Sequence, residues 1–473
     1  MSSKSAEVFD AIVVGSGAAG GWAAKELTEG GMSVLVLEAG RPIDEDLDFS
    51  PDMNPNIMGM WCRAWYAIRG QHIQARYGSF RRGVSQFFVN DRENPYSVPS
   101  GAPFLWYRGR QVGGRMHTWS RAVLRMSDSE FGRPDLDRNE GTFWPISYDD
   151  LAPYYDKVER TLGVIGDRDG VENLPDGLFE PVPTVTAANA AFAKLIMDRT
   201  GLRVVRNRVV RHNTNRIPLP LGHAMRTGRL VVQPDAVVDR VLIDGSTGNA
   251  SGVGYFDRLS GNYTEAPARR VVLSASAFES VRILLNSGCP QHPGGIGARS
   301  GVLGRYVCDH VMVGKGGYTS TEFSASVEAA AKKNVPHSSD PYDFGVYSMY
   351  MPNFCHASEN GLGFIGGYGI QCEATNQTWR MLAFGPMAPR FENRITLNPR
   401  KNDAWGIPVA HIDIRHRENE INMARHINGA MDRIVRQIGF TSREGGGKFA
   451  RGPQALMFNL LKRMVLQKSG AFH

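Results

Sequence analysis

Three glycines near the N-terminus have the spacing of a dinucleotide-binding turn. Gly15, Gly17 and Gly20 follow the apolar run "AIVV" and precede a segment whose apolar residues have helical spacing. In such a turn the first glycine permits the sharp bend, the second lets the backbone approach a pyrophosphate, and the third lets helix and sheet pack closely. The helix N-terminus at Ala18 would offer free N–H groups to the phosphates. A merely tight turn would also use glycine, so the spacing alone leaves both interpretations open.

The surroundings of this turn favour the dinucleotide interpretation. Glu38 ends the next apolar run, and an acidic residue about 20 positions after the first glycine can accept hydrogen bonds from a ribose. The same glycine spacing recurs within 361–366, but no strand pattern precedes that copy and no helix pattern follows it. We therefore interpret the second copy as structural turns and the first as a dinucleotide site. These residues do not yet distinguish FAD from NAD.

The elements around the turn indicate an α/β protein. Residues 8–38 have the pattern of strand, helix and strand, and two buried strands joined by a helix imply a parallel sheet. Short β-branched runs alternate with turns in 203–275, and 311–405 is also strand-like. Helical spacing with start or stop signals predicts three further helices. They fall within 147–163, 276–288 and 418–440.

Composition and charge exclude several classes of protein. The 473 residues are 42% hydrophobic and 21% charged, which suits a large folded core and argues against disorder. The net charge of +7 is scattered and no nucleic-acid motif accompanies it, so we expect no nucleic-acid partner. The N-terminus has no apolar signal core and no run is long enough to span a membrane. A cytoplasmic location is the expectation, although export with a signal-bearing partner would leave the same sequence.

Cysteines and histidines show no metal-binding pattern. The five cysteines are widely separated and form no CxxC pair, which argues against a disulfide framework and a zinc site. His411, His416 and His426 have no ligand spacing with a carboxylate. We therefore expect no bound metal. His310 follows a segment with the pattern of a buried strand, and we expect it to be a hydrogen-bonded core residue.

Longer stretches resemble the glucose–methanol–choline (GMC) family of FAD oxidoreductases. The N-terminal turn carries the resemblance together with "RGRQVGGRMHTWSRAVLRMSDSEF", "SASAFESVRILLNSG" and "RFENRITLNPRKNDAWGIP". It covers nearly the whole chain and is closest to the branch that oxidises sugars and glycosides. In this family the "VGG" turn and the residues after it line the flavin, and a backbone position later in the chain contacts adenine. The resemblance implies FAD contacts at Val112, Gly113, Gly114, His117, Thr118, Trp119, Val238, Ser274 and Ala275.

The "VGG" segment departs from some relatives at one position. Certain family members attach FAD covalently to a histidine in this motif, and the matching residue here is Thr118. His117 lies one position earlier, and adjacent side chains need not point the same way. The resemblance therefore implies non-covalent FAD, with His117 either lining the site or serving a structural role.

The end of the sequence carries the residue that resembles the catalytic base of the family. In "QKSGAFH" the resemblance assigns this role to His473. A neutral imidazole can take the hydroxyl proton while the alcohol carbon delivers hydride to flavin. The family's following segment, with a second proton-handling residue, is absent from the sequence, so we expect weak or no turnover by this polypeptide. The alternative is that His473 is a terminal residue without a role.

These inferences combine into one expected architecture and function. We expect a Rossmann-like FAD domain from 1–125 and 203–310, a helical connection at 126–202, an antiparallel substrate domain at 311–442, and a return segment at 443–473. The expected reaction is FAD-dependent oxidation of a secondary ring hydroxyl of a sugar or glycoside. An NAD-dependent dehydrogenase and a non-catalytic FAD-binding subunit are the alternatives. The sequence does not identify the electron acceptor (oxygen, quinone or cytochrome), and it is compatible with a homo-oligomer or a small partner subunit.

Overall fold

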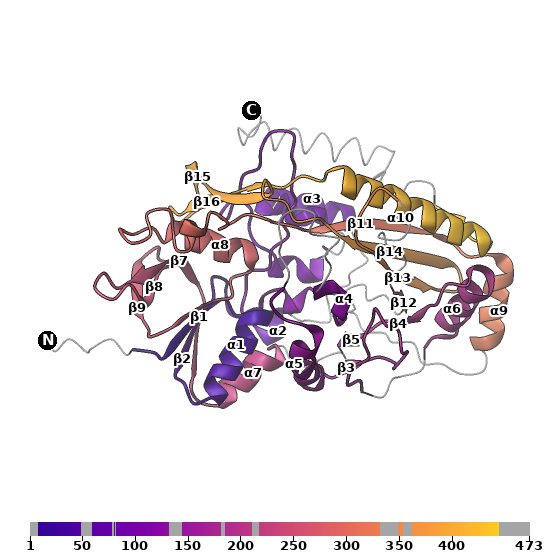
Figure 1. Cartoon of the computed structure of the whole chain (residues 1–473), viewed down its shortest axis with the longest axis horizontal. Helices are drawn as coiled ribbons and strands as arrows, with labels where there is room; N and C mark the ends of the chain where they lie inside the picture. Colours follow the sequence, from indigo (N-terminus) through magenta and orange to yellow (C-terminus); the bar gives the residue numbers. More distant parts are fainter. Residues whose placement is uncertain are drawn as a thin grey trace.

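Two sheets form the two ends of an elongated molecule in the computed structural model (Figure 1). One sheet is parallel and contains the N-terminal strand; the other is antiparallel and lies under the long C-terminal helix. The predicted fold class, α/β with a Rossmann-like sheet and a separate antiparallel sheet, is confirmed. The structure describes residues 8–48, 59–77, 80, 82–131, 144–180, 185–210, 217–331, 349–352 and 362–443.

The parallel sheet has four strands in the order β10-β1-β2-β6. All neighbouring strands are parallel, and Ile12 pairs with Leu35 on one side and Val271 on the other. Helix α1 connects the first two strands, so the predicted strand–helix–strand unit is confirmed. The bounds are β1 (Ala11–Val14), α1 (Ala18–Glu29), β2 (Val34–Leu37), β6 (Leu230–Gln233) and β10 (Val271–Leu273).

Both faces of this sheet are covered, which explains why its strands are apolar throughout. Ala11 and Val13 pack towards α1 and α7, whereas Ile12 and Val14 pack towards a three-stranded antiparallel sheet and α8. Alternate side chains of a strand point to opposite faces, so a strand buried on both faces has no polar positions. The covering elements are α7 (Leu219–Arg226), β7 (Ala236–Ile243), β8 (Ala250–Asp257), β9 (Tyr263–Pro267) and α8 (Ala277–Asn286).

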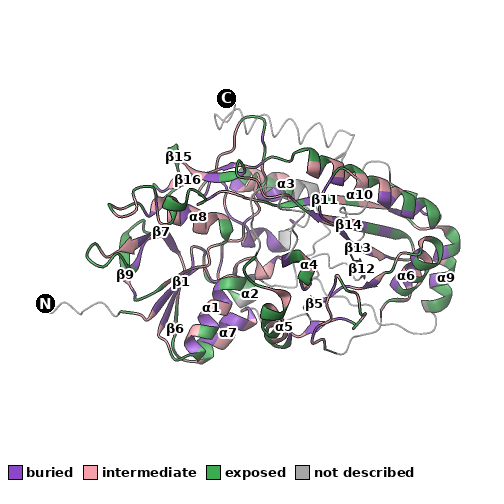
Figure 2. Cartoon of the chain, in the orientation of Figure 1, coloured by how far each residue is buried: buried purple, intermediate pink, exposed green. Residues whose placement is uncertain are grey.

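The antiparallel sheet has six strands in the order β17-β11-β14-β13-β12-β4. Three helices cover one of its faces, and each helix is buried towards the sheet and exposed on its outer side (Figure 2). The strands are β4 (Val205–Arg206), β11 (His310–Tyr318), β12 (Met349–Met351), β13 (Gly369–Ala374), β14 (Thr378–Pro386) and β17 (Thr441–Ser442). The helices are α6 (Ala187–Thr200), α9 (Thr321–Ala331) and α10 (Glu418–Gln437).

A hairpin of β15 (Arg394–Asn402) and β16 (Pro408–Asp413) packs on the parallel-sheet side of the molecule. Ile395 and Ile412 of the hairpin share a hydrophobic cluster with Phe278 and Val281 of α8. The remaining elements are short, apart from α5. They are α2 (Glu45–Asp48), α3 (Gly59–Tyr66), η1 (Ala67–Gln71), η2 (Gln74–Arg76), η3 (Arg82–Phe87), η4 (Gly114–His117), α4 (Asp128–Phe131), α5 (Tyr148–Leu162), β3 (Val164–Ile165), β5 (Val209–Val210) and η6 (Ala298–Ser300).

The three separately predicted helices are present as α5, α8 and α10, whereas α7 and α9 lie in regions where strands were predicted. Helix α7 lies in a region predicted as strands and turns; Pro218 precedes it and its apolar residues pack on α1. Helix α9 lies in a region predicted as strand-like. Its Phe323 and Val327, one helical turn apart, fill the core beneath the antiparallel sheet.

The prediction for His310 was wrong. This residue begins β11 rather than ending a buried strand, and its side chain is 67% exposed. Its Nδ1 lies 3.2 Å from the carboxylate of Asp309, and this hydrogen bond raises the pKa of His310. The preceding apolar run belongs to a partly exposed connection, which apolar pattern alone does not distinguish from a buried strand.

Candidate cofactor site

The first glycine turn connects β1 to α1. Gly15 has φ +96°, and a β-carbon there would lie 2.5 Å from the carbonyl oxygen of Ser274. A β-carbon on Gly20 would lie 1.8 Å from the carbonyl oxygen of Gly15. At Gly17, by contrast, no atom lies within 4 Å of that position. Gly15 and Gly20 are therefore required for packing, whereas Gly17 leaves open space at the N-terminus of α1.

Ser16 joins this turn to Glu38 and to the second glycine turn. A carboxylate oxygen of Glu38 accepts hydrogen bonds from the Ser16 amide (3.0 Å) and hydroxyl (2.5 Å). The other accepts one from the Gly40 amide (2.8 Å). The Ser16 hydroxyl in turn accepts a hydrogen bond from the amide of Gly113 (3.0 Å). Because a carboxylate can accept about four hydrogen bonds, Glu38 retains capacity for a ribose hydroxyl.

The second glycine turn lies directly on the first. Gly113 and Gly114 have φ values of +88° and +54°, which other residues rarely adopt. A β-carbon at Gly114 would lie 3.0 Å from the α-carbon of Gly17. The two turns, far apart in the sequence, thus form adjacent walls of one cavity of about 300 Å³.

The cavity brings together eight of the predicted site residues. Those lining it are Gly15, Gly17, Ala18, Glu38, Gly114, Val238, Ser274 and Ala275. The others that the structure describes are outside its lining: Gly20, Val112, Gly113, His117, Thr118 and Trp119. His473 lies outside the described residues, so its role stays a prediction.

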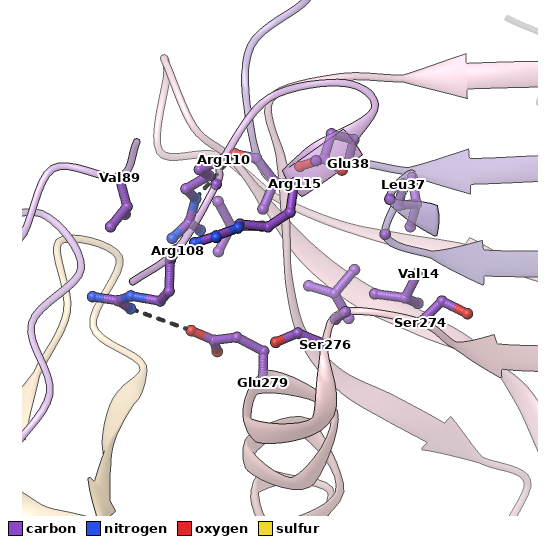
Figure 3. A pocket seen from close by; sticks show the side chains of 18 of the residues that line it. Val14, Leu37, Glu38, Val89, Arg108, Arg110, Arg115, Ser274, Ser276 and Glu279 are labelled. Atoms are coloured by element: carbon purple, nitrogen blue, oxygen red, sulfur yellow. Dashed lines mark hydrogen bonds and ion pairs between the residues drawn. The ribbon is translucent and has the colours of Figure 1, made fainter. Parts of the chain in front are cut away.

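Charged residues that the sequence analysis did not single out also line the cavity. Figure 3 shows Arg108, Arg110 and Arg115, which come from the segment that precedes and follows the second turn. Arg282 of α8 also lines the cavity. Glu38 and Glu279 are the acidic residues of the lining, which leaves an excess of positive charge suited to a pyrophosphate. The "RGR" letters, one residue before "VGG", were the signal that could have identified two of these arginines.

Glu279 is held between two of the arginines. Its carboxylate lies 3.5 Å from Arg108 and 3.2 Å from Arg282 (Figure 3 shows the contact with Arg108). Burial by itself would raise the pKa of Glu279, but Arg282, Arg108 and Arg110 together lower it below the ordinary value. Glu279 is therefore a carboxylate at neutral pH. It compensates buried positive charge at the edge of the cavity.

The predicted site residues at 117–119 are packed rather than exposed to the cavity. His117 lies 2.9 Å from the carbonyl oxygen of Val112 and stacks on Phe87 at a centroid distance of 5.3 Å. Thr118 is 1% exposed, and Trp119 packs against the cluster of Leu162, Val164 and Val210. The structure thus supports the structural alternative for His117. Non-covalent attachment of FAD stays a prediction.

Burial of His117 should make stability depend on pH. Burial lowers the pKa of His117, whereas the unfolded imidazole titrates near pH 6.5. The contribution is complete above about pH 6.5 and is lost as the pH falls, because the unfolded chain then binds a proton that the folded site disfavours. Urea unfolding of wild type and His117→Phe between about pH 7.5 and pH 5.5 should show the wild type losing more stability. An unchanged difference across this range would contradict the assignment.

The site fits an adenine dinucleotide. It combines open space above Gly17, a helix N-terminus, a ribose acceptor in Glu38 and excess positive charge. A parallel sheet with these features at the carboxyl ends of its strands defines a dinucleotide-binding protein. The second glycine turn adds a close backbone approach beyond the usual motif. Within the described part of the chain, no cluster of His, Cys, Asp or Glu is suited to a metal, and none of the helices there is long and apolar enough for a membrane span.

Comparisons with known proteins identify the dinucleotide as FAD and show what the chain is similar to. A family model described as "FAD binding domain" matches residues 10–51, and one described as "GMC oxidoreductase" matches 210–312. The chain is 25% identical to 2-methyl-1,2-propanediol dehydrogenase of Mycolicibacterium austroafricanum, covering 91% of this chain and 80% of that protein. It is 24% identical to paromamine 6'-oxidase of Streptomyces fradiae, over 94% of this chain and 80% of that protein. Its fold is similar to formate oxidase of Aspergillus oryzae (TM-score 0.62, 15% identity, 98% and 87% covered).

The chain thus contains family-model domains of the GMC oxidoreductase and FAD-binding types. It is an FAD-dependent oxidoreductase, and FAD rather than NAD is its cofactor.

Proposed function

We propose that this enzyme oxidises a secondary ring hydroxyl of a sugar or glycoside. The similarity to a paromamine 6'-oxidase supports a polyhydroxylated substrate. The observation that carries the proposal is the chemistry of one face of the antiparallel sheet. That face is opposite the face on which α6, α9 and α10 pack.

Two polar side chains without a hydrogen-bond partner in the described part of the chain lie side by side on this sheet face. Tyr350 of β12 is the register partner of Gln371 of β13, so both point to the same face. The Tyr350 ring crosses diagonally over Gly369, because a β-carbon on Gly369 would lie 1.8 Å from the Tyr350 hydroxyl. Neither the hydroxyl nor the Gln371 amide hydrogen-bonds to another described residue. Phe384, the register partner of Gly369, adds an aromatic ring to the same face.

These side chains suit the recognition of hydroxyl groups. Burial raises the pKa of Tyr350 to about 12, so its phenol stays neutral and can both donate and accept hydrogen bonds. The amide of Gln371, which is 8% exposed as a residue, likewise offers a donor and an acceptor. An aromatic ring beside such groups matches a sugar ring, which presents hydroxyls at its edge and C–H groups on its faces. A simple aliphatic alcohol would leave the polar groups unsatisfied.

The chain's contribution to the reaction is binding, orientation and proton transfer. When bound, FAD supplies the acceptor for the hydride of the alcohol carbon. The glycine turns, Glu38 and the arginines would hold its phosphates and ribose, and the sheet face would orient the substrate hydroxyl. Removal of hydride requires loss of the hydroxyl proton, and His473 remains the base predicted from the sequence. General-base assistance typically contributes about a hundred- to ten-thousand-fold.

Anaerobic reduction of bound FAD tests the proposal. We expect glucosides and aminoglycosides to bleach the oxidised flavin, and Tyr350→Phe and Gln371→Leu each to raise KM about two- to tenfold, because each removes one hydrogen bond. Gln437→Leu, which changes an exposed amide on the helix side of the sheet, is the matched control and should leave KM unchanged.

Two results would redirect the interpretation. Equal rates with sugars and short aliphatic alcohols, unaffected by either variant, would show that the sheet face does not select the substrate. A protein that retains FAD but is reduced by no alcohol would favour the non-catalytic subunit.

A further inference from the structure

Arg110 lines the cavity and forms no ion pair with a carboxylate among the residues that the structure describes. Its Nε donates a weak hydrogen bond to the carbonyl oxygen of Ala39 (3.4 Å), and its guanidinium lies over the indole of Trp405, 5.1 Å from the ring centroid. No other described residue forms an ion pair or hydrogen bond with the guanidinium. Arg108 and Arg282, by comparison, share Glu279. The guanidinium thus lies between an aromatic ring and the cavity that it lines.

Trp405 is held in place by its surroundings. It lies in the turn of the β15–β16 hairpin, where its backbone amide donates to the carboxylate of Asp403 (3.0 Å). Its indole N–H points to the carbonyl oxygen of Arg258 (3.4 Å). Asp403 is itself bound by Arg282 (2.7 Å). The indole therefore offers Arg110 a fixed aromatic surface rather than a mobile one.

The order of groups in FAD places adenine beside Arg110. The pyrophosphate belongs at Gly17 and the N-terminus of α1, and the ribose belongs at Glu38. Ala39, whose carbonyl binds Arg110, immediately follows Glu38. Adenine is attached to the ribose on the side away from the phosphates. It therefore extends past Glu38 towards the guanidinium.

We propose that Arg110 stacks on the adenine of FAD, so that Trp405, the guanidinium and the base form one column. The hairpin turn thereby becomes part of the cofactor site, although its sequence lies far from the glycine turns. This inference requires FAD as the cofactor but does not depend on the substrate proposed above.

The chemistry of arginine supports stacking rather than simple charge attraction. A guanidinium is planar and weakly hydrated, and it stacks on aromatic faces. A buried cation without a partner is unfavourable unless another group compensates for its lost hydration. Although burial lowers the pKa of Arg110 to about 10, the group is still a cation at neutral pH. Glu279 and Glu38 raise the pKa of Arg110 through their charge without forming an ion pair with it, and a purine face can supply the direct contact.

Ligand titrations of the apoprotein test the column. FAD binding is followed by flavin fluorescence, and ADP and inorganic pyrophosphate are measured as competitors. Arg110→Lys keeps the charge but loses the plane, so we expect it to weaken FAD and ADP binding about three- to thirtyfold and to leave pyrophosphate binding unchanged. Trp405→Leu should weaken ADP in the same direction, whereas Trp405→Phe should restore most of the affinity. Arg69→Ala, which removes an exposed arginine over Trp65, is the matched control and should change neither.

Only variants that unfold at the same temperature as wild type are compared. In these, the affinities for ADP and for pyrophosphate distinguish stacking on adenine from charge attraction and from phosphate binding. If Arg110→Lys binds ADP as tightly as wild type, charge alone explains the residue and the stacking proposal is overturned. If ADP and pyrophosphate weaken equally, Arg110 is a phosphate ligand, and the proposal is again overturned. Reduction of the bound flavin by sugars has no bearing on these outcomes.

Discussion

Gly17→Val should abolish FAD retention while leaving the apoprotein folded. A β-carbon at Gly17 meets no atom within 4 Å, and its φ of −66° is compatible with any residue. The added side chain therefore costs the fold at most about 1 kcal/mol, through a poorer helix N-cap. It would, however, fill the space in which a pyrophosphate approaches the backbone. Loss of two charge-assisted hydrogen bonds corresponds to roughly 100- to 10,000-fold weaker binding.

Flavin content of the purified protein and unfolding of the apoprotein separate these effects. Gly20→Val is the informative control, because its β-carbon would overlap the carbonyl oxygen of Gly15 at 1.8 Å. That variant should lose both stability and FAD. If Gly17→Val retained wild-type flavin content, the pyrophosphate could not lie against this turn, and the assignment of the whole cavity would be wrong.

Arg282→Met should destabilise the apoprotein by about 3–5 kcal/mol, the usual cost of breaking a buried ion pair. The guanidinium binds the carboxylate of Asp403 (2.7 Å) and the carbonyl oxygens of Pro408 (2.7 Å) and Ile407 (3.0 Å). Both charged side chains are nearly fully buried. Methionine fills similar space but leaves the carboxylate without a cation. Urea unfolding of the apoprotein measures the loss.

Two further variants isolate the ion pair. Arg240→Met removes an arginine whose side chain is 44% exposed beside Asp239, and its cost should stay below about 1 kcal/mol. Adding Asp403→Asn to Arg282→Met should recover part of the stability, because the unpaired charge is then removed. A loss below about 1 kcal/mol for Arg282→Met alone would mean that the network is solvated and not structural.

Local sequence patterns were sufficient to predict the parallel sheet and its first turn. The run "AIVV", the glycines and the second apolar run specify β1, α1 and β2 through contacts between neighbours in the chain. The capping box at Ser147 and Asp150 likewise marks the start of α5, because both partners lie within one helical turn. Such signals can be recognised without knowing the rest of the fold.

The charged part of the site could not be predicted in this way. Glu279 of α8 binds Arg108, and Arg282 of the same helix binds Asp403. These ion pairs form because α8 lies between the second-turn segment and the β15–β16 hairpin. No periodicity within any one segment records that arrangement. Helix α9 illustrates the same limit for the fold: Ser320 caps its start, but Phe323 and Val327 pack beneath an antiparallel sheet whose strands lie elsewhere in the chain.

The hydroxyl of Ser16 has a consequence for engineering a different cofactor preference. Because that oxygen is bonded to Glu38 and also accepts the Gly113 amide, the acidic residue cannot be exchanged in isolation. A designer who swaps it for a basic side chain, to accommodate a phosphorylated ribose, also releases the serine. The backbone amide of Gly113 in the second glycine turn then loses the hydroxyl that accepts its hydrogen bond. Redesign would have to treat the three positions as one unit.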